Sequence, residues 1–229
     1  MIDETMNADF SEMRLKMIDG QIRTTDVTHS GILLAMGAVP REAFVARNLA
    51  ALAYIDEDLL IAEASAVSPA RFLMEPSPFA KLLQLADVRQ GDVVLVIGAG
   101  TGYSAAVIAR LAGSVVALEC NAELAEQARL ALSELGTAEV SLVGGRLQDG
   151  WAQRAPFDVI FIEGAVDAVP EVLFDQLREG GRLVTVEGRG NAGVARLYLK
   201  DNGFVTGRRA FNAAVKPLPG FERAEAFEF

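Results

Sequence analysis

A chain of 229 residues, with 51% hydrophobic and 23% charged residues, has the composition of an ordinary globular domain. Its formal net charge of −10 argues against broad binding to nucleic acid, because contacts with the phosphate backbone require clustered Lys and Arg. No apolar run approaches the roughly 20 residues of a membrane-spanning helix, and the acidic N-terminus is unlike a signal peptide. We therefore expect one cytoplasmic domain, residues 1–229, whose oligomeric state the sequence leaves open.

Histidine and cysteine occur once each, and this scarcity excludes several kinds of site. A zinc site built from His and Cys cannot be assembled, and we expect no metal. Cys120 has no second cysteine with which to form an intrachain disulfide, which is typical of a cytoplasmic protein. A Ser-His-Asp triad would have to use His29, which we interpret instead as a residue at a helix start or on the surface.

The first part of the chain, residues 1–76, is predicted to form a helical and irregular cap. Apolar residues among polar ones indicate a helix over residues 10–22. A second helical pattern begins at Ser30 and is interrupted at Pro40. Residues 51–76 have no regular pattern, so we predict irregular structure there.

The remainder, residues 77–229, alternates between strand and helix patterns and is predicted to be the core. Ser77 followed by Pro78 is a typical N-cap and first helical position, and Asn121 is expected to cap a later helix. The expected helices are 77–88, 104–112, 122–135 and a segment that begins near Pro170. The expected strands are 93–97, 115–119, 140–143, 157–162, 182–187, 194–200 and 203–211.

This alternation predicts an α/β fold with a doubly wound, mostly parallel sheet that helices cover on both faces. The last two strands are joined by Asp-Asn-Gly, a short turn sequence, and we predict that they form an antiparallel pair at the end of the sheet.

A glycine-rich segment, Gly98 to Gly102, follows the first predicted strand of the core. Small residues there let the backbone approach a ligand at the start of the next helix. Glu119 ends the second strand, and a carboxylate at that place can accept hydrogen bonds from the two hydroxyls of a ribose. The expected ligand therefore contains adenosine with a free diol, as both NAD and S-adenosylmethionine do.

The glycine spacing separates these two cofactors. The dinucleotide fingerprint is G-x-G-x-x-G, whereas this segment reads G-x-G-x-G and continues with the bulky Tyr103. Too few residues follow Glu163 for a second mononucleotide-binding half and a substrate domain. The pattern favours S-adenosylmethionine, with an NAD-binding oxidoreductase or a turn without a ligand as the alternatives.

The segment VLVIGAGTGYSAAVIARLAGSVVALE resembles the cofactor loop and the following strand of the protein-L-isoaspartate O-methyltransferases. MIDGQIRTTDV, AVPREAFV and LREGGRLV continue the resemblance, which covers most of residues 13–187. It implies the class I S-adenosylmethionine-dependent methyltransferase fold, a seven-stranded sheet with a helical N-terminal extension. It also implies methylation of the α-carboxylate of L-isoaspartyl residues in damaged proteins or peptides, which starts their repair.

The same resemblance implies a set of cofactor-binding residues. The glycine loop would wrap the methionine end, Glu119 would hold the ribose, and the segment from Gly145 would border the adenine. The family usually has an acidic residue where this chain has Gly145, so adenine recognition is expected to be weakened or reshaped. The candidate cofactor-binding residues are Gly98, Ala99, Gly100, Thr101, Gly102, Tyr103, Glu119, Cys120, Gly145, Arg146 and Leu147.

A second departure concerns the acceptor. The family motif is close to T-I-S-x-P, and its serine lies by the transferred methyl group and the acceptor carboxylate. A gapless alignment matches FLMEP to it and places Met74 where that serine should be, whereas the alternative, Ser68, requires an insertion. A thioether cannot donate a hydrogen bond. We assign Met74 to the catalytic site, together with Glu163 just past the fourth strand.

Several residues and functions remain open at this stage. Glu75 in the altered loop is a weaker acceptor-side candidate, Tyr103 either lines the pocket or packs, and Trp151 is expected to be a packing anchor. Loss of the serine leaves room for another carboxylate or a small molecule as acceptor. It also leaves room for a protein without catalytic activity that senses the cofactor or engages a partner.

Overall fold

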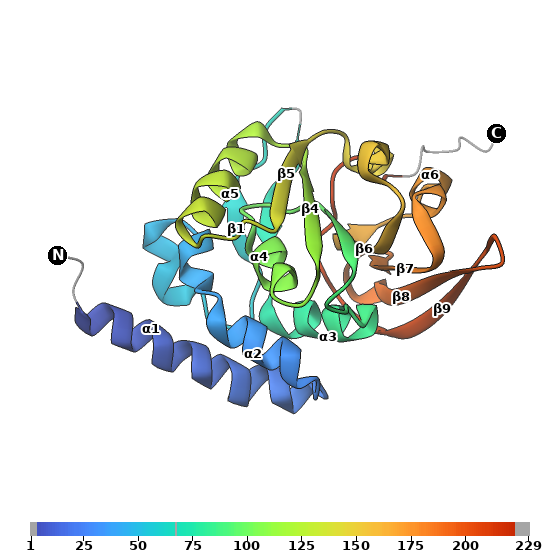
Figure 1. Ribbon diagram of the computed structural model, residues 1–229. Helices are drawn as coiled ribbons and strands as arrows, with labels where there is room; N and C mark the ends of the chain where they lie inside the picture. Colours follow the sequence, from blue (N-terminus) through green and yellow to red (C-terminus); the bar gives the residue numbers. More distant parts are fainter. Residues whose placement is uncertain (1–3, 67, 223–229) are drawn as a thin grey trace.

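The computed structural model describes residues 4–66 and 68–222, and its centre is a seven-stranded sheet flanked by helices (Figure 1). The strand order is β5-β4-β3-β6-β7-β8-β9, parallel up to β7 and antiparallel for β8 and β9. This order confirms the predicted fold. The strands are β3 (Val93–Ile97), β4 (Ser114–Glu119), β5 (Val140–Gly144), β6 (Phe157–Val166), β7 (Leu177–Glu187), β8 (Val194–Asp201) and β9 (Phe204–Asn212).

Alternating side chains of the central strands enter two different hydrophobic clusters, one on each face of the sheet. Along β3, Val94 and Val96 belong to one cluster, whereas Leu95 and Ile97 belong to the other. This follows from the period of two along a strand, and burial on both faces explains why these strands read as continuous apolar runs. Trp151 packs against the second cluster, as expected of a packing anchor.

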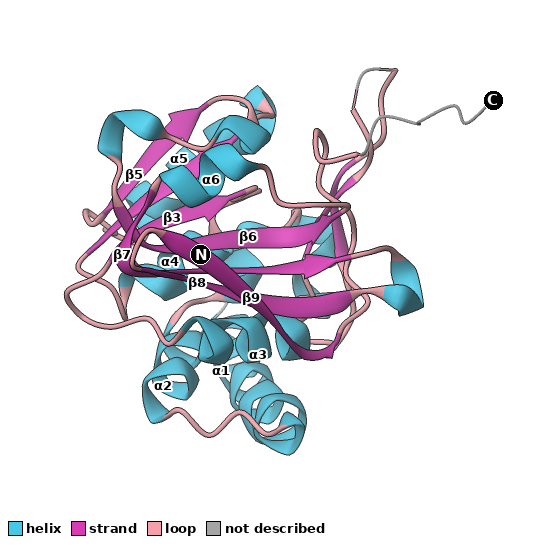
Figure 2. Ribbon diagram, turned by 90° about the vertical axis from the view of Figure 1, so that its right-hand side faces the viewer, coloured by secondary structure: helices cyan, strands magenta, loops and turns pink. Residues whose placement is uncertain are grey.

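Helices connect the strands and cover both faces of the sheet. Figure 2 shows α1 and α2 gathered with α3 on one side of the sheet and α6 on the other. None of the helices in the described ranges is long and apolar enough to cross a membrane. The helices are α1 (Glu4–Met17), α2 (Ser30–Ala38), α3 (Pro76–Ala86), α4 (Tyr103–Ala109), α5 (Ala122–Glu134) and α6 (Glu171–Asp175).

The N-terminal region is mainly helical, as predicted. α1 continues into a π-helical turn, Ile18–Ile22, and 3-10 turns cover Arg41–Phe44 and Arg47–Leu52. His29 is the N-cap of α2, and its Nδ1 accepts from the backbone N–H of Ile32 at 3.3 Å. His29 is therefore a helix-start residue, as we interpreted it.

The expectation of irregular structure over residues 51–76 was wrong in part. Two short strands, β1 (Leu59–Ala62) and β2 (Arg71–Leu73), form an antiparallel two-stranded sheet that is separate from the main one. Strands of this length are too short to show an alternating pattern in the sequence. The boundary between a cap of residues 1–76 and a core of 77–229 stays a prediction.

The predicted N-cap of α3 was also wrong. The cap position is Glu75, and Ser77 is buried in the first turn. Asp56 accepts hydrogen bonds from the backbone N–H of Ser77 at 3.0 Å and from its hydroxyl at 2.7 Å, and Asp58 accepts from the backbone N–H of Glu75 at 3.0 Å. Two carboxylates from a distant loop thus supply the negative charge that a helix N-terminus favours.

The predicted cap of α5 is confirmed. The side chain of Asn121 accepts from the backbone N–H groups of Glu123 at 2.9 Å and Leu124 at 3.1 Å. Asn121 directly follows Cys120 at the end of β4, so one local signal fixes both the end of the strand and the start of the helix.

After β9 the chain returns across the carboxyl end of β6. The backbone N–H of Ala165 donates to the carbonyl of Lys216, and that of Leu218 donates to the carbonyl of Ala165, both at 2.9 Å. This pairing buries Leu218 among the residues of the second cluster. The C-terminal segment, residues 213–222, is therefore a structural part of that edge of the sheet.

Candidate active site

The candidate site lies where β3, β4 and β6 meet at the carboxyl end of the sheet. Gly98 follows β3, Glu119 ends β4, and Glu163 lies in the last part of β6. The two carboxylates are buried, at 1% and 8% residue exposure. In open parallel sheets this edge is where ligands bind, and here it holds two buried carboxyl groups, a residue type that is rarely buried.

All three glycines of the loop adopt a left-handed backbone conformation. Gly98, Gly100 and Gly102 have φ angles of +83°, +55° and +98°, values that side chains rarely permit. Gly102 also allows close helix packing, because a Cβ atom on it would lie 3.2 Å from the Cβ of Ala128 in α5. The hydroxyl of Thr101 donates to the carbonyl of Phe44 at 2.6 Å and ties the loop to the N-terminal region.

Glu119 collects hydrogen bonds from the segments around it. One carboxylate oxygen accepts from the backbone N–H groups of Cys120 and Asn121, each at 2.9 Å, and the other accepts from Gly100 at 2.7 Å. Arg71 on β2 binds both oxygens, at 2.7 and 3.0 Å. Sequence reasoning missed Arg71, because nothing in the sequence indicates which distant residue faces Glu119.

Apolar side chains of the chain itself cover the glycine loop. A Cβ atom on Gly98 would lie 2.8 Å from Cδ2 of Leu218, and one on Gly100 would lie 2.9 Å from Cδ1 of Ile61. Leu218 comes from the C-terminal segment and Ile61 from β1. The chain's own side chains therefore fill the space above the glycine loop.

Glu163 is a buried acid with an unusual proton affinity. Ser104 on α4 donates its hydroxyl hydrogen bond to the Glu163 carboxyl group. Burial raises the pKa of Glu163 from 4.5 to about 8, although Ser104, Arg71 and Arg41 act in the opposite direction. Glu163 is therefore mainly protonated at neutral pH, and it can present a neutral acid to the site.

Arg41 links the N-terminal region to the glycine loop. It is fully buried and donates to the carbonyls of Ala53 and Met74, both at 2.7 Å, and its guanidinium lies 4.8 Å from the centre of the Tyr103 ring. Tyr103 packs against two phenylalanine rings. Within the described residues, the hydroxyl of Tyr103 and Nη1 of Arg41 have no hydrogen-bond partner. Tyr103 therefore serves as a packing residue with a polar end.

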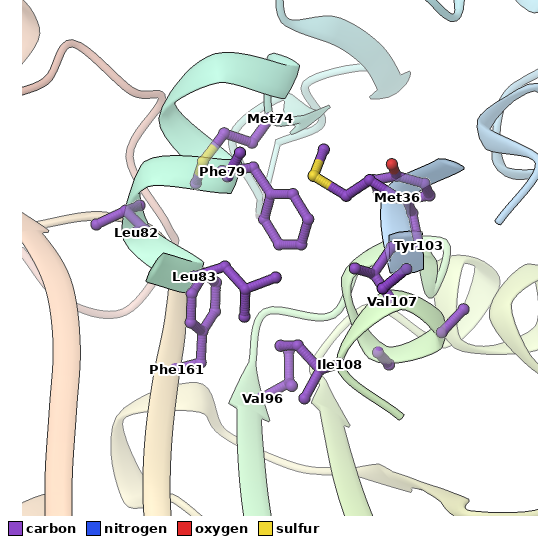
Figure 3. Packing of buried hydrophobic residues seen from close by; sticks show 14 of the residues in the cluster. Met36, Met74, Phe79, Leu82, Leu83, Val96, Tyr103, Val107, Ile108 and Phe161 are labelled. Atoms are coloured by element: carbon purple, nitrogen blue, oxygen red, sulfur yellow. The ribbon is translucent and has the colours of Figure 1, made fainter. Parts of the chain in front are cut away.

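Met74 is placed deep in the protein. Its side chain is 4% exposed and packs in the first hydrophobic cluster with Phe79 and Met36 (Figure 3). The backbone carbonyl of Met74 accepts the hydrogen bond from Arg41. The assignment of Met74 to the acceptor side stays a prediction.

Glu75 lies next to Met74 in a cluster of acidic residues. Partial burial and the carboxylates of Asp58 and Asp56 raise the pKa of Glu75 to about 7. Because Asp56 and Asp58 are used to cap α3, the cluster is explained in part by the start of that helix.

A hollow of about 370 Å³, lined in part by Glu119, lies where the adenine was expected. Gly145 lines it, whereas Arg146 is exposed and pairs with Asp149 at 3.6 Å, and Leu147 is buried in the second cluster. The other lining residues are Cys120, Ala122, Ala125, Glu126, Arg129, Leu142, Val143 and Gly144.

Gly145 has little free space beside it. A Cβ atom there would lie 3.3 Å from Cδ1 of Leu118, which is a tight approach, and 3.5 Å from the ring of Trp151, which is an ordinary van der Waals contact. An added side chain would therefore meet Leu118 most closely. In the same region, burial and the Glu119 carboxylate raise the pKa of the Cys120 thiol, which disfavours a reactive thiolate.

The structure therefore brings together most of the predicted site residues. The glycine loop, Glu119, Cys120 and Gly145 line one edge, and Glu163 lies beside them. His29 lies elsewhere, as the cap of α2. Residues 4–66 and 68–222 contain no cluster of His, Cys, Asp and Glu that could hold a metal ion.

Comparison with known proteins gives a consistent result. Residues 12–220 match the model of the family described as protein-L-isoaspartate(D-aspartate) O-methyltransferase. A protein-L-isoaspartate O-methyltransferase from Koribacter versatilis is 40% identical over 175 residues, which are 76% of each chain. One from Methylorubrum populi is 42% identical over 171 residues, 75% of this chain and 77% of the relative.

Solved structures agree with this match. A protein-L-isoaspartate O-methyltransferase structure superposes with a TM-score of 0.79 at 28% identity, over 90% of this chain and 66% of the other. A beta-aspartate methyltransferase from Plasmodium falciparum, solved in complex with S-adenosyl-L-homocysteine, gives 0.74 at 19% identity, over 90% and 97% of the two chains. At that identity the second comparison supports the fold alone.

Proposed function

Because this chain belongs to the protein-L-isoaspartate(D-aspartate) O-methyltransferase family, a family of S-adenosylmethionine-dependent enzymes, we propose that it methylates isoaspartyl residues of proteins or peptides. The acceptor atom is an oxygen of the α-carboxylate. The observation that carries the proposal is a glycine loop and a ribose-type carboxylate at adjacent strand ends, within a family match over residues 12–220. We place the protein in the cytoplasm, because Cys120 has no second cysteine with which to form an intrachain disulfide.

The proposed binding residues are those that the resemblance to the family implies. Glu119 would hold the ribose hydroxyls, and the hollow beside Gly145 would take the adenine. The cofactor supplies an electrophilic methyl group on a sulfonium. The remaining proposed contacts are Gly98, Ala99, Gly100, Thr101, Gly102 and Tyr103 at the methionine end, and Cys120, Arg146 and Leu147 around the adenine.

The chain's contribution to the reaction is mainly positional. An acceptor carboxylate is ionised at neutral pH, so no strong general base is required. The protein must bring the acceptor oxygen into line and exclude water. A protonated Glu163 would suit this task, because a neutral acid donates a hydrogen bond to a carboxylate and does not repel it.

Met74 changes how the acceptor can be held. A serine at this position would donate a hydrogen bond to the acceptor, whereas a thioether cannot. Its buried place in the hydrophobic cluster favours a second candidate function, an S-adenosylmethionine-dependent enzyme with a different carboxylate or small-molecule acceptor. A sensing protein without catalytic activity would share the same cofactor site.

The test is methyl transfer from labelled cofactor to an isoaspartyl peptide and to its aspartyl twin, with enzyme in excess. Met74→Ser is run alongside, and Leu199→Ser, a change on the exposed face of β8, serves as the control. We expect transfer to the isoaspartyl peptide alone. No transfer to that peptide, with cofactor binding demonstrated by calorimetry, would refute this acceptor. Transfer by Met74→Ser only would place the difference from the family at residue 74.

A further inference from the structure

The carboxylate proposed to bind ribose is fully engaged by the protein. Glu119 accepts six hydrogen bonds: three from backbone N–H groups, two from the Arg71 guanidinium and one from the Cys120 thiol at 3.5 Å. A carboxylate offers about four lone-pair positions. The side chains of Arg71 and Glu119 are 3% and 0% exposed, so solvent does not weaken the pair. Two ribose hydroxyls therefore have no free acceptor position on Glu119.

Of the strong donors, only Arg71 can leave, and the Cys120 thiol is a weak donor. The three backbone N–H groups belong to the glycine loop and to the start of α5, and both are fixed by the main sheet. Arg71 lies on β2, which among the described residues pairs only with β1, in a sheet of its own. Displacement of this small sheet breaks no hydrogen bond of the seven-stranded sheet. A ribose diol and Arg71 are thus alternative partners of one carboxylate.

The same small sheet covers the glycine loop. Ile61 of β1 lies against Gly100, and Arg71 also donates to the carbonyl of Gly98 at 3.3 Å. Leu218 from the C-terminal segment covers Gly98 from the other side. The contacts at Glu119 and over the loop therefore block the ribose and methionine parts of the proposed cofactor site together.

We propose that Arg71 is a latch on the cofactor site, which must release Glu119 before S-adenosylmethionine can bind. The proposal rests on the proposed cofactor contacts and adds a regulation of the same site. In the latched form Arg71 pairs with Glu119, and Ile61 fills the space above the glycine loop. In the released form β1 and β2 have moved away together and the carboxylate accepts the ribose hydroxyls. The apparent affinity for the cofactor is then the intrinsic affinity reduced by the fraction of molecules that are released.

Binding of S-adenosylhomocysteine tests this latch without any methyl acceptor. Dissociation constants would be measured by calorimetry for the wild type, Arg71→Gln and Arg71→Lys. We expect Arg71→Gln to bind S-adenosylhomocysteine about tenfold more tightly than the wild type. This is the change in dissociation constant that results if latched molecules outnumber released ones by about ten to one in the wild type. Arg71→Lys keeps the charge but loses the two-point contact, and should fall between the two. Arg89→Gln is the control, because Arg89 pairs with Asp87 on an exposed surface.

Association kinetics give a second readout. Trp151, the only tryptophan, lies against Gly145, which lines the proposed adenine hollow, and its fluorescence would report binding. If release limits binding, the observed rate in the wild type levels off as ligand concentration rises. In Arg71→Gln it should rise linearly over the same concentrations.

Two smaller substitutions keep the proposal testable if Arg71→Gln does not fold. Ile61→Ala and Leu218→Ala open the space over the glycine loop without changing Glu119, and each should tighten binding severalfold. Unchanged or weaker binding in Arg71→Gln, or in both alanine variants, would overturn the latch. If no variant binds S-adenosylhomocysteine, both the latch and the proposed cofactor site are wrong. Latch behaviour without transfer to an isoaspartyl peptide would refute only the proposed acceptor.

Discussion

Replacement of Glu163 by glutamine should change how the stability of the protein depends on pH. Burial raises the pKa of Glu163 from 4.5 to about 8 in the folded protein. Between these values the unfolded chain has lost the proton that the folded protein keeps. Because stability falls with rising pH wherever the folded state holds more protons, Glu163 lowers the free energy of unfolding across this window. Glutamine cannot ionise and keeps a hydrogen bond with Ser104.

The size of the effect follows from this linkage. One proton held by the folded state alone changes the free energy of unfolding by at most about 1.4 kcal/mol per pH unit. Between pH 5.5 and 7.5 we therefore expect Glu163→Gln to gain about 2 kcal/mol relative to the wild type. Glu75, whose pKa is also raised, titrates equally in both proteins and cancels in the difference.

The measurement is urea unfolding of both proteins at pH 5.5, 6.5 and 7.5, followed by Trp151 fluorescence and circular dichroism. Glu126→Gln is the matched control, because Glu126 is exposed on α5 and pairs with Arg129. It should give a small difference that does not grow with pH. A constant difference between wild type and Glu163→Gln would refute the reasoning, since it would mean that Arg41 and Arg71 keep Glu163 ionised.

Three further substitutions probe the elements that build the site. Asp56→Ala removes the distant cap of α3, and urea unfolding should show a free energy of unfolding about 1 kcal/mol lower than in the wild type. Asp56→Asn should show a smaller decrease in the free energy of unfolding. Gly102→Ala should lower the free energy of unfolding by about 1–3 kcal/mol because of its φ of +98° and its tight packing on α5. The control Gly37→Ala, at an open helical position of α2, should leave the free energy of unfolding unchanged or raise it. Equal losses in the two variants would contradict this reasoning. Gly145→Asp should lower Tm without tightening S-adenosylhomocysteine binding in calorimetry, because a Cβ atom at this position lies only 3.3 Å from Leu118. Tighter binding would show that the hollow can still accept an acidic residue.

The features that sequence predicted well are local or periodic. The strands of the main sheet were predicted because buried apolar runs alternate with helices, and the two antiparallel strands because a short turn joins them. Asn121 was recognised as a cap because the residue and the N–H groups it binds are two and three positions apart. The glycine loop was placed between a strand and a helix for the same reason, since its glycines directly follow an apolar run.

The features that sequence missed depend on contacts between distant irregular segments. Arg71 meets Glu119 across 48 positions, and Asp56 caps a helix that begins many residues later. Neither contact leaves a repeating pattern, because each involves one side chain from a short strand or a loop. Leu218 was missed for a similar reason, as its place depends on the C-terminal segment returning to β6. Such pairings are set by the tertiary fold and cannot be read from a single chain segment.

The return of the C-terminal segment to β6 also determines when the glycine loop is covered during synthesis of the chain. A ribosome makes the glycine loop, β4 and β6 well before residues 213–222 leave its exit tunnel, so Gly98 and Gly164 stay uncovered in the nascent chain until Leu218 arrives. Domains generally begin to fold from their N-terminal side as they emerge. A nascent chain that lacks this segment would therefore leave the surface at Gly98 and Gly164 uncovered at the carboxyl end of the sheet.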